Sequence, residues 1–186
     1  MSQPLPTAPP RAPFNDALML AAALLAAVVP TLLALHRPPS ATMLNQCVAV
    51  ALWGGLAVVV APGRLHLRQT GALLAAIGLV LMAALASWQW GTLPSSLSFQ
   101  AVGLLAGAAL MVATGASAAG GLQRTTVFVA LAWGLLAAGV LSSGVALVQV
   151  FAPTWADGQW IAQAVLPGRA SGNLRQPNHL CDLLLW

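Results

Sequence analysis

The chain has 186 residues, of which 59% are hydrophobic and 5% are charged. A soluble globular domain has about 45–50% apolar and about 25% charged residues, so this composition indicates that the lipid bilayer is the solvent of the chain. The net charge of +4 comes from arginines that stand singly between apolar runs, which excludes a basic face for nucleic-acid binding.

The first sixteen residues, MSQPLPTAPPRAPFND, hold five prolines and no apolar periodicity. They predict a disordered cytoplasmic tail over residues 1–16. A secretory signal peptide is the alternative for the apolar run that follows. Arg11 followed by Asp16 is a poor positively charged flank, and the run is long for a signal peptide. We therefore expect an uncleaved anchor helix.

Apolar runs of spanning length follow the tail, each close to the ~20 residues that cross ~30 Å of hydrocarbon as a helix. They are Ala17–Leu35, Met43–Ala61, Gly71–Trp90, Leu97–Ala116 and Thr126–Phe151. We expect residues 17–151 to form an all-α, polytopic membrane helical bundle with about five complete transmembrane helices. Residues 179–186 are expected to start a sixth helix, which the chain truncates.

The arginines predict the orientation, because short cytoplasmic loops keep an excess of positive residues. With the N-terminus in the cytoplasm, four arginines fall on the inner side: Arg11, Arg64, Arg68 and Arg124. Arg37, Arg169 and Arg175 fall on the outer side, and the last two are also candidates for a binding role. The segment 152–178 is then a periplasmic loop of a bacterial inner-membrane protein. Trp88, Trp90, Trp155 and Trp160 lie near span ends, where interfacial indoles anchor membrane proteins.

Cys47 and Cys181 lie far apart in apolar surroundings, with no second cysteine or histidine at metal-ligand spacing. The sequence therefore predicts no metal site and no cofactor. We expect both thiols to pack as free cysteines, with a disulfide on the oxidising side as the less favoured alternative.

Polar side chains of several kinds collect after residue 151, at the mouth of the last complete span. They are Arg169, Asn173, Arg175, Gln176, Asn178 and His179. Pro177 suits the first turn of a helix, so Gln-Pro-Asn predicts the start of a new spanning helix. The free N–H groups at that helix start favour an anion such as a diphosphate.

Two arginines and two glycines complete this predicted anion site. Arg169 and Arg175 supply planar guanidinium groups, which bind phosphate oxygens in pairs and stay protonated. Gly168 and Gly172 let the loop turn tightly and bring its backbone close to a ligand. The alternative is an ordinary interfacial loop, with arginines held by lipid headgroups and Gln176 or Asn178 capping the helix.

The string Arg169–Ala170–Ser171–Gly172, followed by Gln176–Pro177–Asn178–His179–Leu180 ahead of an apolar helix, resembles a known pattern. It is the pattern of the O-antigen ligase and protein O-oligosaccharyltransferase superfamily, and the likeness is strongest to the pilin-glycosylation ligase branch. The match covers about a dozen residues. Arg175 before the glutamine and Asp182 within the helix are less usual in that pattern, and they leave the substrate class open.

The resemblance implies a C-type glycosyltransferase of the inner membrane that moves a preassembled glycan from undecaprenyl diphosphate to an acceptor in the periplasm. The acceptor is a Ser or Thr hydroxyl of a protein, or the lipid A core. The residues that this likeness assigns to the donor diphosphate are Arg169, Gly172, Arg175, Gln176 and Asn178. No catalytic residue is assigned, although Asp157, Asp182 and His179 are titratable groups nearby.

The family also has a large periplasmic loop with a catalytic His and Arg, and nothing in this chain corresponds to it. We therefore expect an N-terminal fragment that is inactive alone. Two other functions stay open: a polysaccharide polymerase of the same superfamily, or a non-enzymatic transporter or interaction subunit. The acceptor, the glycan, the stereochemical outcome and the oligomeric state are not encoded in this stretch.

Overall fold

The computed structural model describes residues 13–35, 43–60, 67–91, 95–119, 124–164, 166, 168–174 and 177–185. Within these residues the chain forms helices and no strand, which confirms the all-α class. The helices are α1 (Pro13–Leu32), α2 (Met43–Val60), α3 (Leu67–Trp90), α4 (Ser95–Ala119), α5 (Arg124–Phe151) and α6 (Pro177–Leu185).

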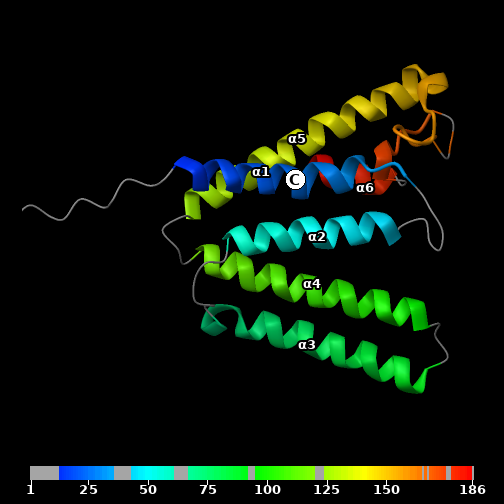
Figure 1. Ribbon diagram of the computed structural model, residues 1–186. Helices are drawn as coiled ribbons and strands as arrows, with labels where there is room; N and C mark the ends of the chain where they lie inside the picture. The colour runs from blue at the N-terminus through cyan, green and yellow to red at the C-terminus, as the bar shows by residue number, and fades with distance from the viewer. Residues whose placement is uncertain are drawn as a thin grey trace, which may run out of the picture.

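The long helices lie side by side and alternate in direction (Figure 1). α1 packs against α5 and α2, α2 also contacts α4, and α3 packs against α4. The alternation brings the carboxyl ends of α1, α3 and α5 to the same end of the bundle as the start of α6 (Figure 1). We call this end the loop end, because the segment between α5 and α6 lies there.

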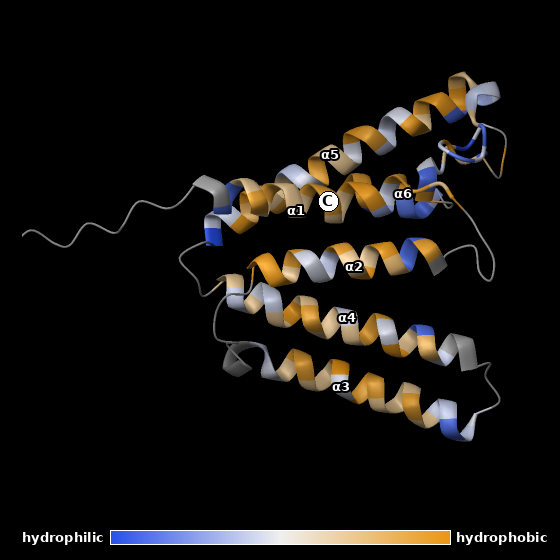
Figure 2. Cartoon of the chain, viewed as in Figure 1, coloured by the Kyte–Doolittle hydropathy of each residue, from blue (hydrophilic) through white to orange (hydrophobic). Residues whose placement is uncertain are grey.

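Four helices are long and apolar enough to cross a membrane, which supports the predicted class of membrane protein. Their apolar spans are Asn15–Leu32, Thr70–Trp90, Ser98–Ala119 and Arg124–Phe151. The second predicted span, Met43–Ala61, corresponds to α2, whose described apolar stretch Leu44–Val60 is shorter than these four. Figure 2 shows the same distribution: apolar residues run along the helices, and hydrophilic residues gather at helix ends and in the loop after α5.

Five helices, namely α1, α3, α4, α5 and α6, begin two to four residues before their predicted apolar runs. α1 begins at Pro13, four residues before the predicted span, so residues 13–16 belong to the helix and not to the tail. Proline fits the first helical turn, and Asp16 in that turn interacts favourably with the positive end of the helix dipole. α6 begins at Pro177, so the helix start predicted from Gln-Pro-Asn is confirmed. Residues 1–12 lie outside the described residues.

Small side chains form the contact between α1 and α5. Ala23 and Ala27 on α1 lie against Gly134 on α5, and Ala23, Ala26 and Ala130 are almost fully buried in the same cluster. A Cβ atom added at Gly134 would lie 2.8 Å from the carbonyl oxygen of Ala23. The two backbones therefore approach as closely as glycine allows, which is the usual way to associate helices in lipid.

The α3–α4 pair is held differently. Trp88 at the end of α3 meets Phe99 on α4 edge to face, with ring centroids 5.6 Å apart. A single polar contact is described between α2 and α4, where Gln100 Nε2 donates to Gln46 Oε1 at 2.7 Å. No residue of the α3 span Thr70–Trp90 is buried inside the protein.

Candidate functional site at the loop end of the bundle

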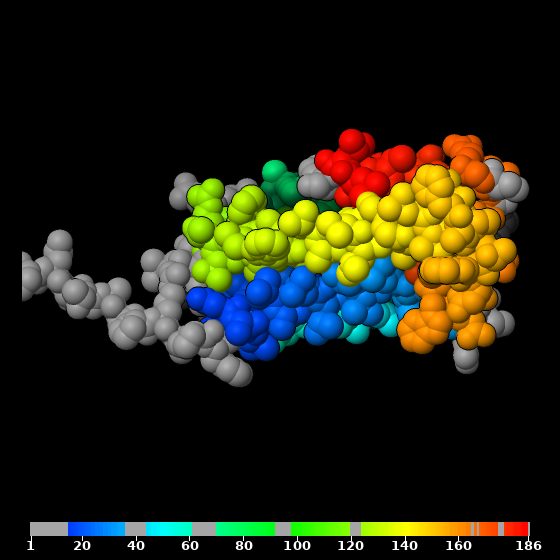
Figure 3. Space-filling model, turned by 90° about the horizontal axis from the view of Figure 1, so that it is seen from above, coloured from blue at the N-terminus to red at the C-terminus, as the bar shows by residue number. Residues whose placement is uncertain are grey.

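The segment after α5 folds back over the helix ends. It begins with the short 3₁₀ turn η1 (Pro153–Trp155), reaches a second one, η2 (Gly172–Leu174), and then enters α6. η1 contacts α5, and η2 contacts α1, α5 and α6. Seen from above, α5 is flanked by α1 and α6, and this segment covers one end of the assembly (Figure 3).

Asp157 organises the first part of the segment. Its Oδ1 accepts hydrogen bonds from the backbone N–H groups of residues 159, 160 and 161, at distances of 2.8–3.1 Å. These bonds, from Ile161 first and then from Trp160 and Gln159, lower the pKa of the Asp157 carboxyl below its usual value because they favour the charged form. Gly158, with φ of 76°, closes the turn by donating its N–H to the carbonyl of Ile161.

Asn173 ties the segment to α1. Its Nδ2 donates to the carbonyl of Leu32, the last residue of α1, at 2.6 Å and to the carbonyl of Trp160 at 2.8 Å. Its Oδ1 accepts the N–H of Ala162 at 2.9 Å. The last carbonyls of a helix lack partners within that helix, so one buried amide both caps α1 and fixes the loop.

Gln149 ties the same segment to α5. This side chain lies in the last turn of α5 and is 3% exposed. Its Nε2 donates to the carbonyls of Ala162 and Gly172 at 2.7 and 2.9 Å. Its Oε1 accepts the N–H groups of Ser171 and Gly172, both at 3.0 Å. The amide therefore satisfies four backbone groups that would otherwise be buried without partners.

Arg169 stands on a tight turn between these two attachment points. Its N–H donates to the carbonyl of Leu166 at 3.1 Å, and Gly168 between them has φ of 77°. A positive φ is easy for glycine and costly for other residues. The Arg169 side chain is exposed at the surface of the loop end.

Gly172 lies beneath the first turns of α6. It is buried, with φ of 57°, and an added Cβ would lie 3.4 Å from a methyl group of Leu180. Its N–H and its carbonyl are both bonded to Gln149. The tight turn expected of Gly168 and Gly172 is therefore present at both positions, and the described contacts of Gly172 are within the protein.

The remaining residues assigned to the diphosphate are distributed as follows. Asn178 is exposed in the first turn of α6, whereas Arg175 and Gln176 lie outside the described residues. The structure thus brings Arg169, Gly172 and Asn178 to the same end of the bundle, with Gly172 packed under α6 and the other two exposed. Among the described residues, no three His, Cys, Asp or Glu side chains lie close enough to hold a metal ion.

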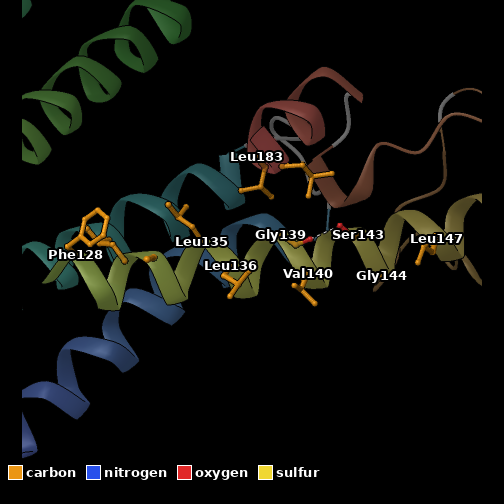
Figure 4. Close-up of a pocket in the computed structure, with 12 residues that line it drawn as sticks. Phe128, Leu135, Leu136, Gly139, Val140, Ser143, Gly144, Leu147 and Leu183 are labelled. Carbon is orange, nitrogen blue, oxygen red and sulfur yellow. Dashed lines mark hydrogen bonds between the residues drawn. The ribbon is translucent and has the colours of Figure 1, made fainter. Parts of the chain in front are cut away.

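An apolar groove of about 890 Å³ runs along α5 beside α6. Figure 4 shows its lining, which extends from Phe128 to Leu147 on α5 and includes Leu183 of α6. The hydroxyl of Ser143 does not make the groove polar, because it donates to the carbonyl of Gly139 in its own helix at 2.8 Å. The groove is suited to a hydrocarbon chain.

The sequence placed Asn173 among the polar residues of the loop end without indicating a role for it, and it did not single out Gln149. A glutamine in the last turn of an apolar span indicates a hydrogen-bonded amide, because burying an unpaired amide in a membrane costs free energy. The partners of Gln149 could not be predicted, since they lie 13 and 23 residues further along the chain.

Comparison of the chain with protein-family models, with curated proteins and with solved structures finds no match in any of the three.

Proposed function

We propose that this chain carries the donor-binding end of an inner-membrane glycosyltransferase. The enzyme transfers a glycan from undecaprenyl diphosphate to a protein hydroxyl or to the lipid A core in the periplasm. The observation that supports this most is the loop end itself: the motif-bearing segment is fixed to α1 and α5 by buried amides, while Arg169 and the start of α6 stay accessible.

The chemistry of these groups suits a diphosphate. A guanidinium group binds two phosphate oxygens at once, and the first N–H groups of a helix attract negative charge. In glycosyl transfer the diphosphate is the leaving group, so negative charge grows on it as the sugar bond breaks. Positive groups that are already in place lower that barrier. In this proposal Arg169 and Arg175 act as charge clamps, and Gln176 and Asn178 orient the phosphates.

The groove beside α6 supports a lipid-linked donor in preference to a soluble one. Its lining is apolar from Phe128 to Leu147, and it ends about one turn before the end of α5. A lipid whose headgroup lies at the start of α6 would therefore run its hydrocarbon chain along α5. A lipid tail is already in hydrocarbon, so the groove would orient it by packing and not by removing it from water.

The proposal includes a topology. We infer that α2 crosses the membrane together with the four longer helices, because its 18 residues span about 27 Å at 1.5 Å per residue. The N-terminus lies in the cytoplasm, and the loop end faces the periplasm. Arg124, the first residue of α5, is then at the cytoplasmic end, as a positive residue in a short inner loop should be.

The test is binding of undecaprenyl diphosphate to the chain in lipid nanodiscs. Arg169→Ala should weaken binding at least about tenfold, because a charge-assisted hydrogen bond is lost. The matched control is Arg124→Ala, which removes an exposed arginine from the opposite end and should leave the affinity unchanged. Undecaprenol, which has the same tail but lacks the phosphates, should compete much more weakly than undecaprenyl diphosphate.

Unchanged affinity in Arg169→Ala, or an equal loss in Arg124→Ala, would contradict the proposal. The same assay addresses the transporter or interaction-subunit alternative, in which the motif is only an interfacial loop. That alternative predicts no specific competition between undecaprenyl diphosphate and its sugar-linked form.

A further inference from the structure

We infer that Gln149 is a positioning residue for the diphosphate site: its buried amide joins Ala162 to Ser171 and Gly172 and thereby fixes where Arg169, which lies between them in the chain, stands. The inference rests on the proposed function for the role of Arg169. The loop closure itself rests only on the contacts of Gln149.

The contacts of Gln149 occur at both ends of one loop. On one side the amide binds the carbonyl of Ala162 at 2.7 Å, and on the other it binds Ser171 and Gly172. Residues 163–170 lie between these attachment points, and Arg169 is among them. Gln149 therefore joins the two ends of the loop, and Asn173 adds a second link there by accepting the N–H of Ala162.

The pairing with Gly172 is reciprocal. Gln149 accepts the N–H of Gly172 at 3.0 Å and donates to its carbonyl at 2.9 Å, as a neighbouring peptide group would. Gly172 in turn packs against Leu180 of α6. Gln149 thus connects α5 to the loop that carries Arg169 and, through Gly172, to the first turns of α6.

This arrangement explains why a polar side chain is placed in an apolar helix. A buried amide without hydrogen-bond partners lowers the stability of the folded protein. The amide of Gln149 is fully paired, because four backbone groups of the segment bind it. Apolar packing alone would hold the segment down without specifying its register, because it is not directional. Four directional hydrogen bonds define one position for the loop, and a bound diphosphate requires Arg169 to be in place.

The first experiment measures amide exchange in the full chain in nanodiscs and does not depend on the proposed function. Gln149→Met keeps the length of the side chain and removes its hydrogen bonds. The Ser171 and Gly172 amides should then exchange at least about tenfold faster, because each loses a buried acceptor. Gln149→Glu retains the acceptor but leaves the carbonyls of Ala162 and Gly172 without a donor, so it should restore only part of the protection. Gln163→Met, a change at an exposed glutamine of the same segment, is the matched control and should have no effect.

Protection of the Ala138 amide in the middle of α5 should be the same in all variants, which shows that the helix is still folded. If Ser171 and Gly172 exchange at the wild-type rate in Gln149→Met, the inference is overturned, and the proposed function is not affected by that result.

The second experiment is a double-mutant cycle on binding of undecaprenyl diphosphate. Gln149→Met should weaken binding about tenfold in the wild-type background and much less in the Arg169→Ala background, because its effect passes through Arg169. A merely structural role would lower the amount of binding-competent protein equally in both backgrounds. Additive effects therefore contradict the inference. Absence of any binding by the wild type contradicts the proposed function, and the exchange measurement then still decides whether Gln149 closes the loop.

Discussion

The α1–α5 pair and the α3–α4 pair are built from similarly apolar helices but are held together in different ways. α1 and α5 bury a row of alanines and Gly134, and their loop end is closed by buried amides. The α3 span has no buried residue, and its described ring contact to α4 is at one end.

The difference arises because only some residue types favour contact between two helices over contact with lipid. Leu and Val gain little by leaving lipid for protein, so the large apolar residues of α3 serve equally well on a lipid-facing surface. Small residues allow close backbone contact, and paired polar groups are directional. α3 and α4 also contain Gly and Ala, but an added Cβ at Gly103 or Gly107 meets nothing within 4 Å, whereas at Gly134 it meets the backbone of α1. The pair with this close backbone contact also carries the candidate site.

The largest expected effect is at Asn173, which holds the loop end of α1. Asn173→Ala leaves the N–H of Ala162 and the carbonyls of Leu32 and Trp160 without their partner. At about 1 kcal/mol for each group, the free energy of unfolding should fall by about 3 kcal/mol in bicelles. Asn178→Ala, at an exposed asparagine of α6, is the control and should change it by less than about 0.5 kcal/mol. Equal losses of unfolding free energy in the two variants would mean that the hydrogen bonds of Asn173 do not stabilise the α1–α5 pair and its loop end.

The next largest effect is at the α1–α5 contact. Gly134→Ala places a methyl group against the backbone of Ala23 and should destabilise the protein by about 2 kcal/mol, as overpacking does. Gly144 lies on the same helix, and an added Cβ there meets nothing within 4 Å. Gly144→Ala should therefore be neutral or slightly stabilising. Thermal unfolding measures both changes. If Gly134→Ala and Gly144→Ala change the stability equally, the close backbone contact at Gly134 does not stabilise the α1–α5 pair.

A smaller effect is expected where the second pair is joined to the rest of the bundle. The Gln100–Gln46 hydrogen bond links α4 to α2, and interhelical hydrogen bonds in membrane proteins contribute about 0.6 kcal/mol on average. A double-mutant cycle with Gln46→Leu and Gln100→Leu should give a coupling free energy of about that size. A coupling free energy several times larger would show that a polar contact also determines how the α3–α4 pair is attached to the bundle.

The smallest effect depends on pH and concerns the Asp157 turn. Because hydrogen bonds lower the pKa of Asp157 in the folded state, their contribution is present above the unfolded pKa of about 3.9. It is lost as the pH falls through the lower folded value. Exchange of the amides of residues 159–161 should therefore accelerate on acidification below about pH 4, relative to the intrinsic rate. Asp157→Asn keeps an acceptor and should remove this pH dependence; if the dependence persists, another group is responsible.

The sequence predicted the helices well because hydrocarbon thickness and apolar run length are directly related. The start of α6 was predicted for a similar reason, since proline has few positions in a helix that it can occupy. The exact boundaries were missed where polar residues extend a helix, as at Pro13 in α1. Four of the five predicted spans correspond to helices that are long and apolar enough to cross a membrane, whereas the apolar stretch of α2 is shorter, so the fifth span stays a prediction.

The contacts of the loop end were beyond sequence reasoning for a physical reason. Asn173 binds the carbonyl of Leu32, which is 141 residues away, and no local pattern encodes that distance. The sequence also does not distinguish the buried face of α5 from its lipid-facing side, because both are apolar. Arg169 was recognised as a candidate from its type and neighbours, whereas the turn that presents it depends on Gln149.

The most direct test of the account is labelling of Ala170→Cys, next to Arg169, with a membrane-impermeant maleimide in spheroplasts. Cys47 and Cys181 are exposed free cysteines, so both are replaced by alanine. The account predicts labelling from outside that undecaprenyl diphosphate slows, and loss of this protection when Arg169→Ala is added. Labelling that requires permeabilised cells, or a rate that undecaprenyl diphosphate does not change, would contradict it.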